Sequence, residues 1–163
     1  MALARIRPLD VQVLFQDRPY RLGEAIDLQV ELSARGDVEV REARVDLVCE
    51  EDYVESYTVM VPDQANITTQ ARSPGGFYIP PPLIPKDVKK EHKETYVHSS
   101  VVFLTDRWFS TDTRDSYAAR LEIEPQAPPH VSIAIVKWRL ETVVDVARAR
   151  DVKTRHKVTI KLK

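Results

Sequence analysis

Cysteine and glycine are both scarce in this sequence, and each shortage excludes a class of site. The single cysteine, Cys49, rules out a disulfide within the chain and a zinc site built from two or more thiolates. Only 4 glycines occur in 163 residues, and the pair Gly75-Gly76 lacks the lysine of a phosphate-binding loop. Cys49 alternates with Val45 and Leu47, which predicts a buried core thiol rather than a nucleophile.

An excess of charge of one sign is also missing. The chain has 24 basic and 25 acidic residues, and its net charge of −1 provides no long-range attraction for nucleic acid or an anionic membrane. No apolar run approaches the roughly 20 residues that span a bilayer, and no apolar core follows the basic N-terminal start. We therefore expect a cytoplasmic protein that binds no nucleic acid and does not insert into a membrane.

The motifs of common enzyme and metal sites are absent as well. The histidines lack the spacing of metal ligands, and no Gly-x-Ser-x-Gly nucleophile elbow occurs. The 4 histidines are His92, His98, His130 and His156. We therefore expect a protein that is not an enzyme, with no catalytic residues, no resident metal and no cofactor.

Period-2 alternation of apolar and polar residues is the strongest pattern present. Between 134 and 146, apolar side chains fall on one side of an extended chain, with Thr142 as the one polar member. Similar alternation predicts strands at 9–15, 25–33, 38–50, 96–104, 117–123 and 157–163. The segments 40–47 and 140–147 also satisfy helical spacing, but both are rich in β-branched residues and lack an N-cap. We therefore predict an all-β fold with at most one short helix.

The segment 62–94 interrupts this pattern with prolines. It contains Pro74, three consecutive prolines at 80–82, and Pro85. Consecutive prolines cannot donate to a sheet ladder, so an edge strand, a polyproline segment and a loop are all compatible with this stretch. Residues 86–94 fit either a short helix or an extended chain. A connection this long within a compact domain is often functional.

Large apolar residues occur at two places that are otherwise polar or proline-rich. Trp108 and Phe109 lie in a predicted turn between strands, where they either fold back onto the core or form a contact patch. Phe77, Tyr78 and Ile79, beside the proline run, present the same two alternatives. These five residues are the candidate protein-contact site.

The same turn also permits a ligand-binding interpretation. Asp106, Asp112 and Asp115 could supply oxygen ligands to calcium, and with Trp108 they could form a carbohydrate site. The alternative is that the aspartates are turn formers. Two arginines in the same stretch would offset the carboxylates, which favours the turn interpretation.

Three stretches carry a family resemblance. Residues 19–32 contain a tyrosine–glycine–glutamate turn that leads into an alternating strand, and residues 38–49 form the strand that would pair with it. Residues 121–140 contain a strand, a proline-rich corner and a strand bearing Trp138. Together they resemble the arrestin-like family of β-sandwiches, which includes the arrestins, the retromer cargo-binding subunit and the bacterial sporulation-control proteins. His130 stands where that family often has serine.

The resemblance implies an immunoglobulin-like antiparallel β-sandwich and a single domain over residues 1–163. It also implies a non-catalytic binding module or scaffold that docks a protein along an exposed strand edge or at a loop-end patch. Two alternatives stay open. One is a sandwich that binds calcium or a carbohydrate, and the other is a structural domain that forms a homodimer through its strand edges.

Overall fold

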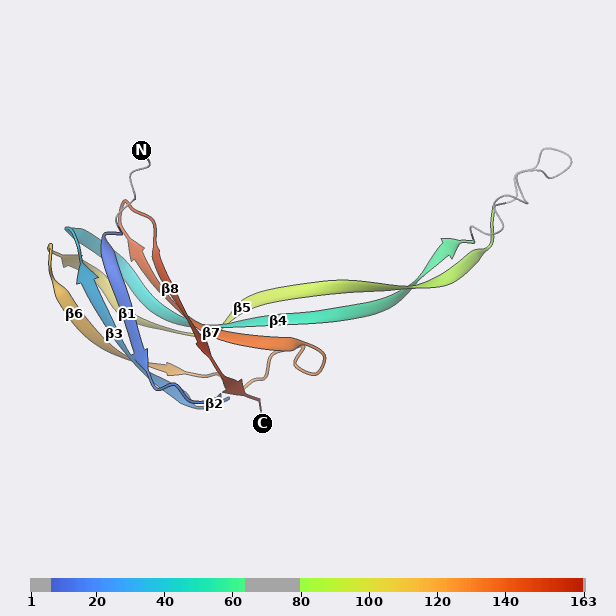
Figure 1. Cartoon of the computed structure of the whole chain (residues 1–163), viewed down its shortest axis with the longest axis horizontal. Helices are drawn as coiled ribbons and strands as arrows, with labels where there is room; N and C mark the ends of the chain where they lie inside the picture. Colours follow the sequence, from blue (N-terminus) through green and yellow to red (C-terminus); the bar gives the residue numbers. More distant parts are fainter. Residues whose placement is uncertain (1–6, 64–79, 163) are drawn as a thin grey trace, which may run out of the picture.

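The computed structural model describes residues 7–63 and 80–162, and within those ranges every regular element is a strand (Figure 1). In chain order the strands are β1 (Leu9–Phe15), β2 (Tyr20–Arg21), β3 (Ala25–Ala34), β4 (Val38–Pro62), β5 (Leu83–Phe109), β6 (Arg114–Glu122), β7 (Ile135–Val146), β8 (Val152–Val158) and β9 (Ile160–Lys161). The prediction of an all-β fold is confirmed.

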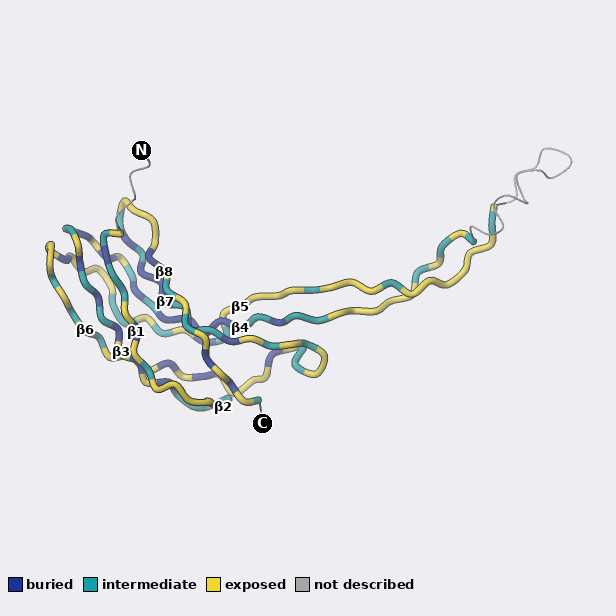
Figure 2. Tube along the Cα trace, viewed as in Figure 1, coloured by how far each residue is buried: buried dark blue, intermediate teal, exposed yellow. Residues whose placement is uncertain are grey.

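Two antiparallel sheets form the body of the molecule. One is three-stranded in the order β1-β3-β6, and the other is four-stranded in the order β5-β4-β7-β8. Buried apolar side chains of both sheets form a shared hydrophobic cluster. Figure 2 marks the buried residues in dark blue along both sheets. Val30, Leu47 and Leu140 are all fully buried in it, on the sides of their strands that the alternation predicted. The antiparallel β-sandwich is therefore confirmed. The expected pairing of strand 38–49 with the strand before it is wrong, because β3 pairs with β1 and β6 whereas β4 lies in the other sheet between β5 and β7.

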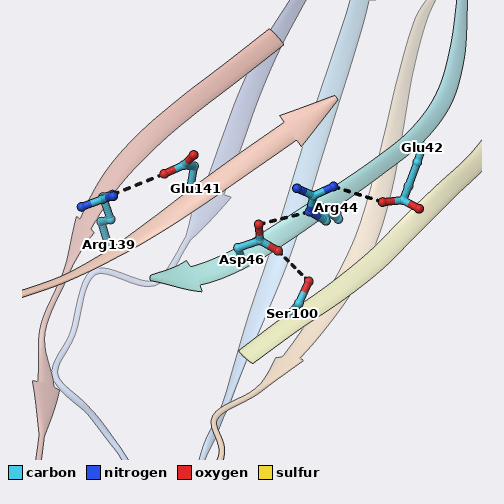
Figure 3. A network of polar contacts seen from close by, with 6 residues as sticks. All are labelled: Glu42, Arg44, Asp46, Ser100, Arg139 and Glu141. Atoms are coloured by element: carbon cyan, nitrogen blue, oxygen red, sulfur yellow. Dashed lines mark hydrogen bonds and ion pairs between the residues drawn. The ribbon is translucent and has the colours of Figure 1, made fainter. Parts of the chain in front are cut away.

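Polar contacts cover the outer face of the four-stranded sheet (Figure 3). Asp46 is only 5% exposed, and it accepts hydrogen bonds from Arg44 Nε at 3.1 Å and from Ser100 Oγ at 2.6 Å. The residues drawn in Figure 3 are Glu42, Arg44, Asp46, Ser100, Arg139 and Glu141. The two donors compensate the negative charge of the buried Asp46 carboxylate, which would otherwise be unfavourable.

Some boundaries differ from the sequence prediction. β4 continues to Pro62 instead of ending at residue 50. Residues 83–94 form part of β5, so the edge strand is the observed one of the alternatives left open for this stretch, and the short helix does not form. Their backbone pairs with β4 over its whole distal half, and β5 lies at a sheet edge, where Pro85 can be accommodated. The single last strand predicted at 157–163 is wrong: β8 ends at Val158, and the chain then shifts to pair β9 with β2 in parallel.

β4 and β5 leave the sandwich together as a long projection (Figure 1). β7 accompanies β4 only as far as the pair Asp52–Ile135. Beyond that pair, the described residues of β4 are joined to β5 alone, down to the pair Pro62–Leu83. We call residues 53–62 and 83–92 the arm. It is a two-stranded ribbon that continues two strands of the four-stranded sheet.

A buried carboxylate holds the base of the arm against the proline-rich corner. The side chain of Glu51 is fully buried, and it accepts a hydrogen bond from Tyr96 Oη at 2.9 Å. It also accepts one from the backbone N–H of His130 at 2.9 Å, and its carboxylate lies 3.2 Å from His130 Nδ1. Burial raises the pKa of Tyr96, so its hydroxyl stays protonated and remains a donor.

Aromatic stacking reinforces the same junction. The ring of Tyr53 stacks with the ring of His130 at a centroid distance of 4.3 Å and with that of His92 at 4.9 Å. Tyr53 Oη also donates to Glu94 at 3.1 Å. The contacts join both strands of the arm to the corner that precedes β7, and so they fix where the arm leaves the sandwich.

We predict that Glu51→Ala lowers the free energy of unfolding by about 2 kcal/mol, because two half-buried donors, Tyr96 Oη and the backbone N–H of His130, lose their acceptor. Urea unfolding followed by tryptophan fluorescence measures the change. Glu55→Ala is the matched control: its carboxylate is 61% exposed and pairs with His92, so the loss should stay below about 0.5 kcal/mol. Equal losses in the two variants would contradict the role assigned to Glu51.

A second prediction concerns Thr142, the polar member of the inward row of β7. Its side chain is fully buried, and within the described residues its hydroxyl has no hydrogen-bond partner. Thr142→Val removes that hydroxyl at nearly constant shape and should raise the free energy of unfolding by about 1 kcal/mol. Thr142→Ser, which retains the hydroxyl but loses a methyl group, should instead lower it. Destabilisation by the valine variant would show that the hydroxyl makes a favourable contact.

Candidate binding surface on the arm

Large apolar residues are exposed along the arm, which Figure 2 draws mainly in the colours of exposed and intermediate residues, whereas most large apolar residues of the sandwich are buried. The exposed fractions are 51% for Val54, 43% for Tyr57, 57% for Met60, 58% for Leu83 and 41% for Ile84. They occur on both faces of the ribbon, because neighbouring residues of a strand point to opposite sides. Grouped exposed apolar side chains of this kind mark interaction surfaces in soluble proteins.

The two strands of the arm differ in charge. Residues 53–62 of β4 read YVESYTVMVP, with Glu55 as the one charged side chain. Residues 83–92 of β5 contain Lys86, Lys89 and Lys90 as well as acidic residues. Lysine on an edge strand discourages pairing with a further strand. The outer edge of β4 is therefore the better candidate for main-chain contacts with another polypeptide.

Ion pairs at the base keep the two strands of the arm in register. Lys93 Nζ lies 3.0 Å from Glu50 Oε1, and Arg139 Nη1 lies 3.2 Å from Glu50 Oε2. The hydrogen bond from Lys93 lowers the pKa of Glu50, so this carboxylate stays charged near neutral pH. On the arm itself, His92 Nε2 lies 2.8 Å from Glu55 Oε2.

Trp108 and Phe109 prove to have opposite environments. Phe109 is fully buried in the core, so its interpretation as a contact residue is wrong. Trp108 is 62% exposed and pairs with Glu39 at the end of the β4–β5 ladder that is remote from the arm. It borders a shallow hollow of about 420 Å³ that also includes Pro8 and Arg148. The other predicted contact residues, Phe77, Tyr78 and Ile79, lie outside the described residues.

The aspartates around Trp108 are not gathered at one point. Asp106 is a β5 residue, and Asp112 lies in the turn before β6. Asp115 pairs with Arg107 across the neighbouring strand ends. Over residues 7–63 and 80–162, no group of three or more His, Cys, Asp or Glu side chains is placed to hold a metal ion. The described geometry therefore does not assemble the three aspartates into a calcium site.

Neither Glu51 nor the β4 edge was predicted from the sequence. A signal for Glu51 was present: it falls on the inward side of the alternation of Val45, Leu47 and Cys49, where a carboxylate must find donors. The stretch YVESYTVMV also has high β propensity. That this segment forms an open sheet edge could not be predicted from the sequence, because the tertiary fold determines which strands pair.

No helix in the described part of the chain is long and apolar enough to cross a membrane.

Comparison with known proteins identifies the architecture alone. No protein-family model matches the sequence, and no curated protein matches it. Among solved structures, the crystal structure of Spo0M, a sporulation control protein from Bacillus subtilis, is similar with a TM-score of 0.65 and 10% sequence identity. The match covers 97% of this chain and 51% of the Spo0M chain, so the chain spans about half the length of that protein. The likeness in structure confirms the resemblance seen in the sequence: this chain has the arrestin-like β-sandwich fold.

Proposed function

We propose that this chain is a non-catalytic, cytoplasmic protein-binding module of arrestin-like type, and that the arm is its binding element. The observation that carries the proposal is the arm itself. It extends two strands beyond the sandwich, with exposed apolar side chains on both faces and an outer β4 edge that no other described strand covers.

The physics of strand edges supports this assignment. An unpaired edge offers a row of backbone N–H and C=O groups, which bind an added strand by main-chain hydrogen bonds. The exposed side chains on alternate faces then provide selectivity for the side chains of that strand. The junction at Glu51 and Tyr53 presents the ribbon at a defined position on the body, which reduces the ordering cost of binding.

The non-catalytic part of the proposal is supported by the state of the one thiol. Cys49 is fully buried, and burial raises the pKa of its thiol, which disfavours the nucleophilic thiolate. Its neighbours in the core are structural side chains of the sheet. The cytoplasmic location stays a prediction, supported by the single unpaired cysteine.

The expected outcome of affinity capture tests this function. Wild-type protein should retrieve one or more proteins from a lysate of the source organism, read by mass spectrometry. The double variant Val54→Lys/Met60→Lys should lose them, because both changes place charge on exposed apolar positions of the arm. Both positions are more than half exposed, so the fold should be retained.

Leu14→Lys is the matched control, since Leu14 is 43% exposed but belongs to β1 of the sandwich. It should retrieve the same proteins as the wild type. Loss of the captured proteins with the control and not with the arm variant would move the binding element to the sandwich. If both variants still retrieve the captured proteins, the arm is not the binding element, and Trp108 becomes the next candidate.

A further inference from the structure

We propose that the outer edge of β4 in the arm is occupied by a second copy of this chain, paired antiparallel about a two-fold axis at Tyr57. The inference rests on the proposed function, because it takes the arm as the binding element and identifies one occupant of it. The two arms would then form one continuous four-stranded sheet in the order β5-β4-β4-β5.

The need for a third strand follows from the arm's construction. A ribbon of two strands is at best marginally stable in water, and a sheet of three or more strands is more stable. Within the described chain, β7 stops at Ile135 opposite Asp52, so the β4 edge from Tyr53 onward receives no strand from the same molecule. A second copy supplies what the fold lacks, since its own β4 edge has the same need.

Charge selects the β4 edge over the β5 edge. Antiparallel pairing of two β5 strands about a two-fold axis at Lys89 or Lys90 would set one ammonium group directly against its own copy. The β4 segment 53–61 has no basic residue, and its one carboxylate, Glu55, is not opposite itself in the pairing proposed below. The β4 edge can therefore pair with the β4 edge of a second copy, whereas the lysines of β5 disfavour the pairing of two β5 edges.

The alternation of side chains restricts the register. Directly opposite residues must lie on the same face of a sheet, so a two-fold axis has to pass between two copies of one residue. An axis at Tyr57 pairs the entire segment 53–61 with itself and leaves out Pro62, which has no N–H to donate. An axis at Thr58 would instead place Pro62 opposite Val54.

Side-chain chemistry favours the axis at Tyr57. It pairs Tyr57 with Tyr57 of the second copy, an aromatic pair of the kind that stabilises cross-strand neighbours. The remaining opposite pairs join apolar with apolar and hydroxyl with hydroxyl, apart from Glu55 with Val59. They are Tyr53 with Val61, Val54 with Met60, Glu55 with Val59 and Ser56 with Thr58, each occurring twice.

Both ends of this pairing coincide with features of the fold. Pro62 of the second copy would arrive opposite Asp52, where β7 already occupies the edge. Ile135 of β7 holds that position and is 69% exposed, so the paired segment of the second copy ends at Val61. The pairing is isologous and closes on itself, so it produces a dimer and not a fibre.

Disulfide trapping tests the register. Opposite residues of an antiparallel pair have Cα atoms about 4.5 to 5.5 Å apart, within the range that a disulfide bridges. Tyr57→Cys should therefore convert to covalent dimer when treated with oxidised glutathione, as seen on a non-reducing gel. Ser56→Cys and Thr58→Cys are the controls: each would lie diagonal to its own copy at about 7 to 8 Å, so both should stay monomeric on the gel. The native Cys49 is buried and contributes no background.

Light scattering tests the assembly itself. Wild-type protein at high micromolar concentration should have twice the mass of one 18.7 kDa chain. Tyr57→Lys places two ammonium groups opposite each other and should give the mass of one chain; because Tyr57 is 43% exposed, the sandwich itself should still fold. A monomeric wild type, a dimer that survives Tyr57→Lys, or trapping by a control cysteine as strong as that by Tyr57→Cys would each overturn the proposal. A monomeric wild type that still captures other proteins through Val54 and Met60 would overturn the dimer and leave the proposed function standing.

Discussion

β4 is the strand on which both parts of the molecule depend. Over its first half it is hydrogen-bonded on both sides, by β5 and β7, and its inward side chains supply a central row of the core. Over its second half it keeps β5 and loses β7. The same backbone therefore passes from the middle of a sheet to an open edge, and the body of the sandwich and the candidate binding surface are one covalent and hydrogen-bonded unit.

The change from middle to edge is marked by an unusual choice of residue. Glu51 is fully buried and occupies the last inward position of β4 before the arm begins at Tyr53. A buried carboxylate is unfavourable unless donors meet it, and Tyr96 and His130 supply them from β5 and from the corner before β7. A leucine at this position could be buried equally well, but it would make no hydrogen bond that fixes the position of the proline-rich corner before β7. Polar contacts therefore specify the direction of the arm, while apolar contacts specify the sandwich.

The parts of the fold that were predictable from sequence are those with one wet face and one dry face. Apolar and polar residues alternate along β1, β3 and β7 because the core covers one side of each strand, and this alternation can be recognised in the sequence. The arm lacks that contrast, because both of its faces are exposed, and so the sequence of residues 83–94 left an edge strand, a loop and a short helix all open. Trp108 and Phe109 illustrate the same rule at single-residue scale. Neighbours in a strand point to opposite faces, so only one of them could join the core. The partner of the β4 edge could not be read from the sequence, because edges arise only when the order of strands in a sheet is known.

The abrupt end of β7 opposite Asp52 also divides the molecule into regions of different local stability. Proteins open in cooperative units, and the least protected units have few buried contacts. Opening of the arm can begin at its far end and proceed one cross-strand pair at a time, since each pair there is supported by its neighbours alone. Further opening becomes more costly at Tyr53 and Glu51, because the aromatic stacking, the hydrogen bonds of the buried carboxylate and the third strand, β7, are all found there. The junction is thus a boundary for unfolding, which allows the arm to fray and re-form while the sandwich stays intact.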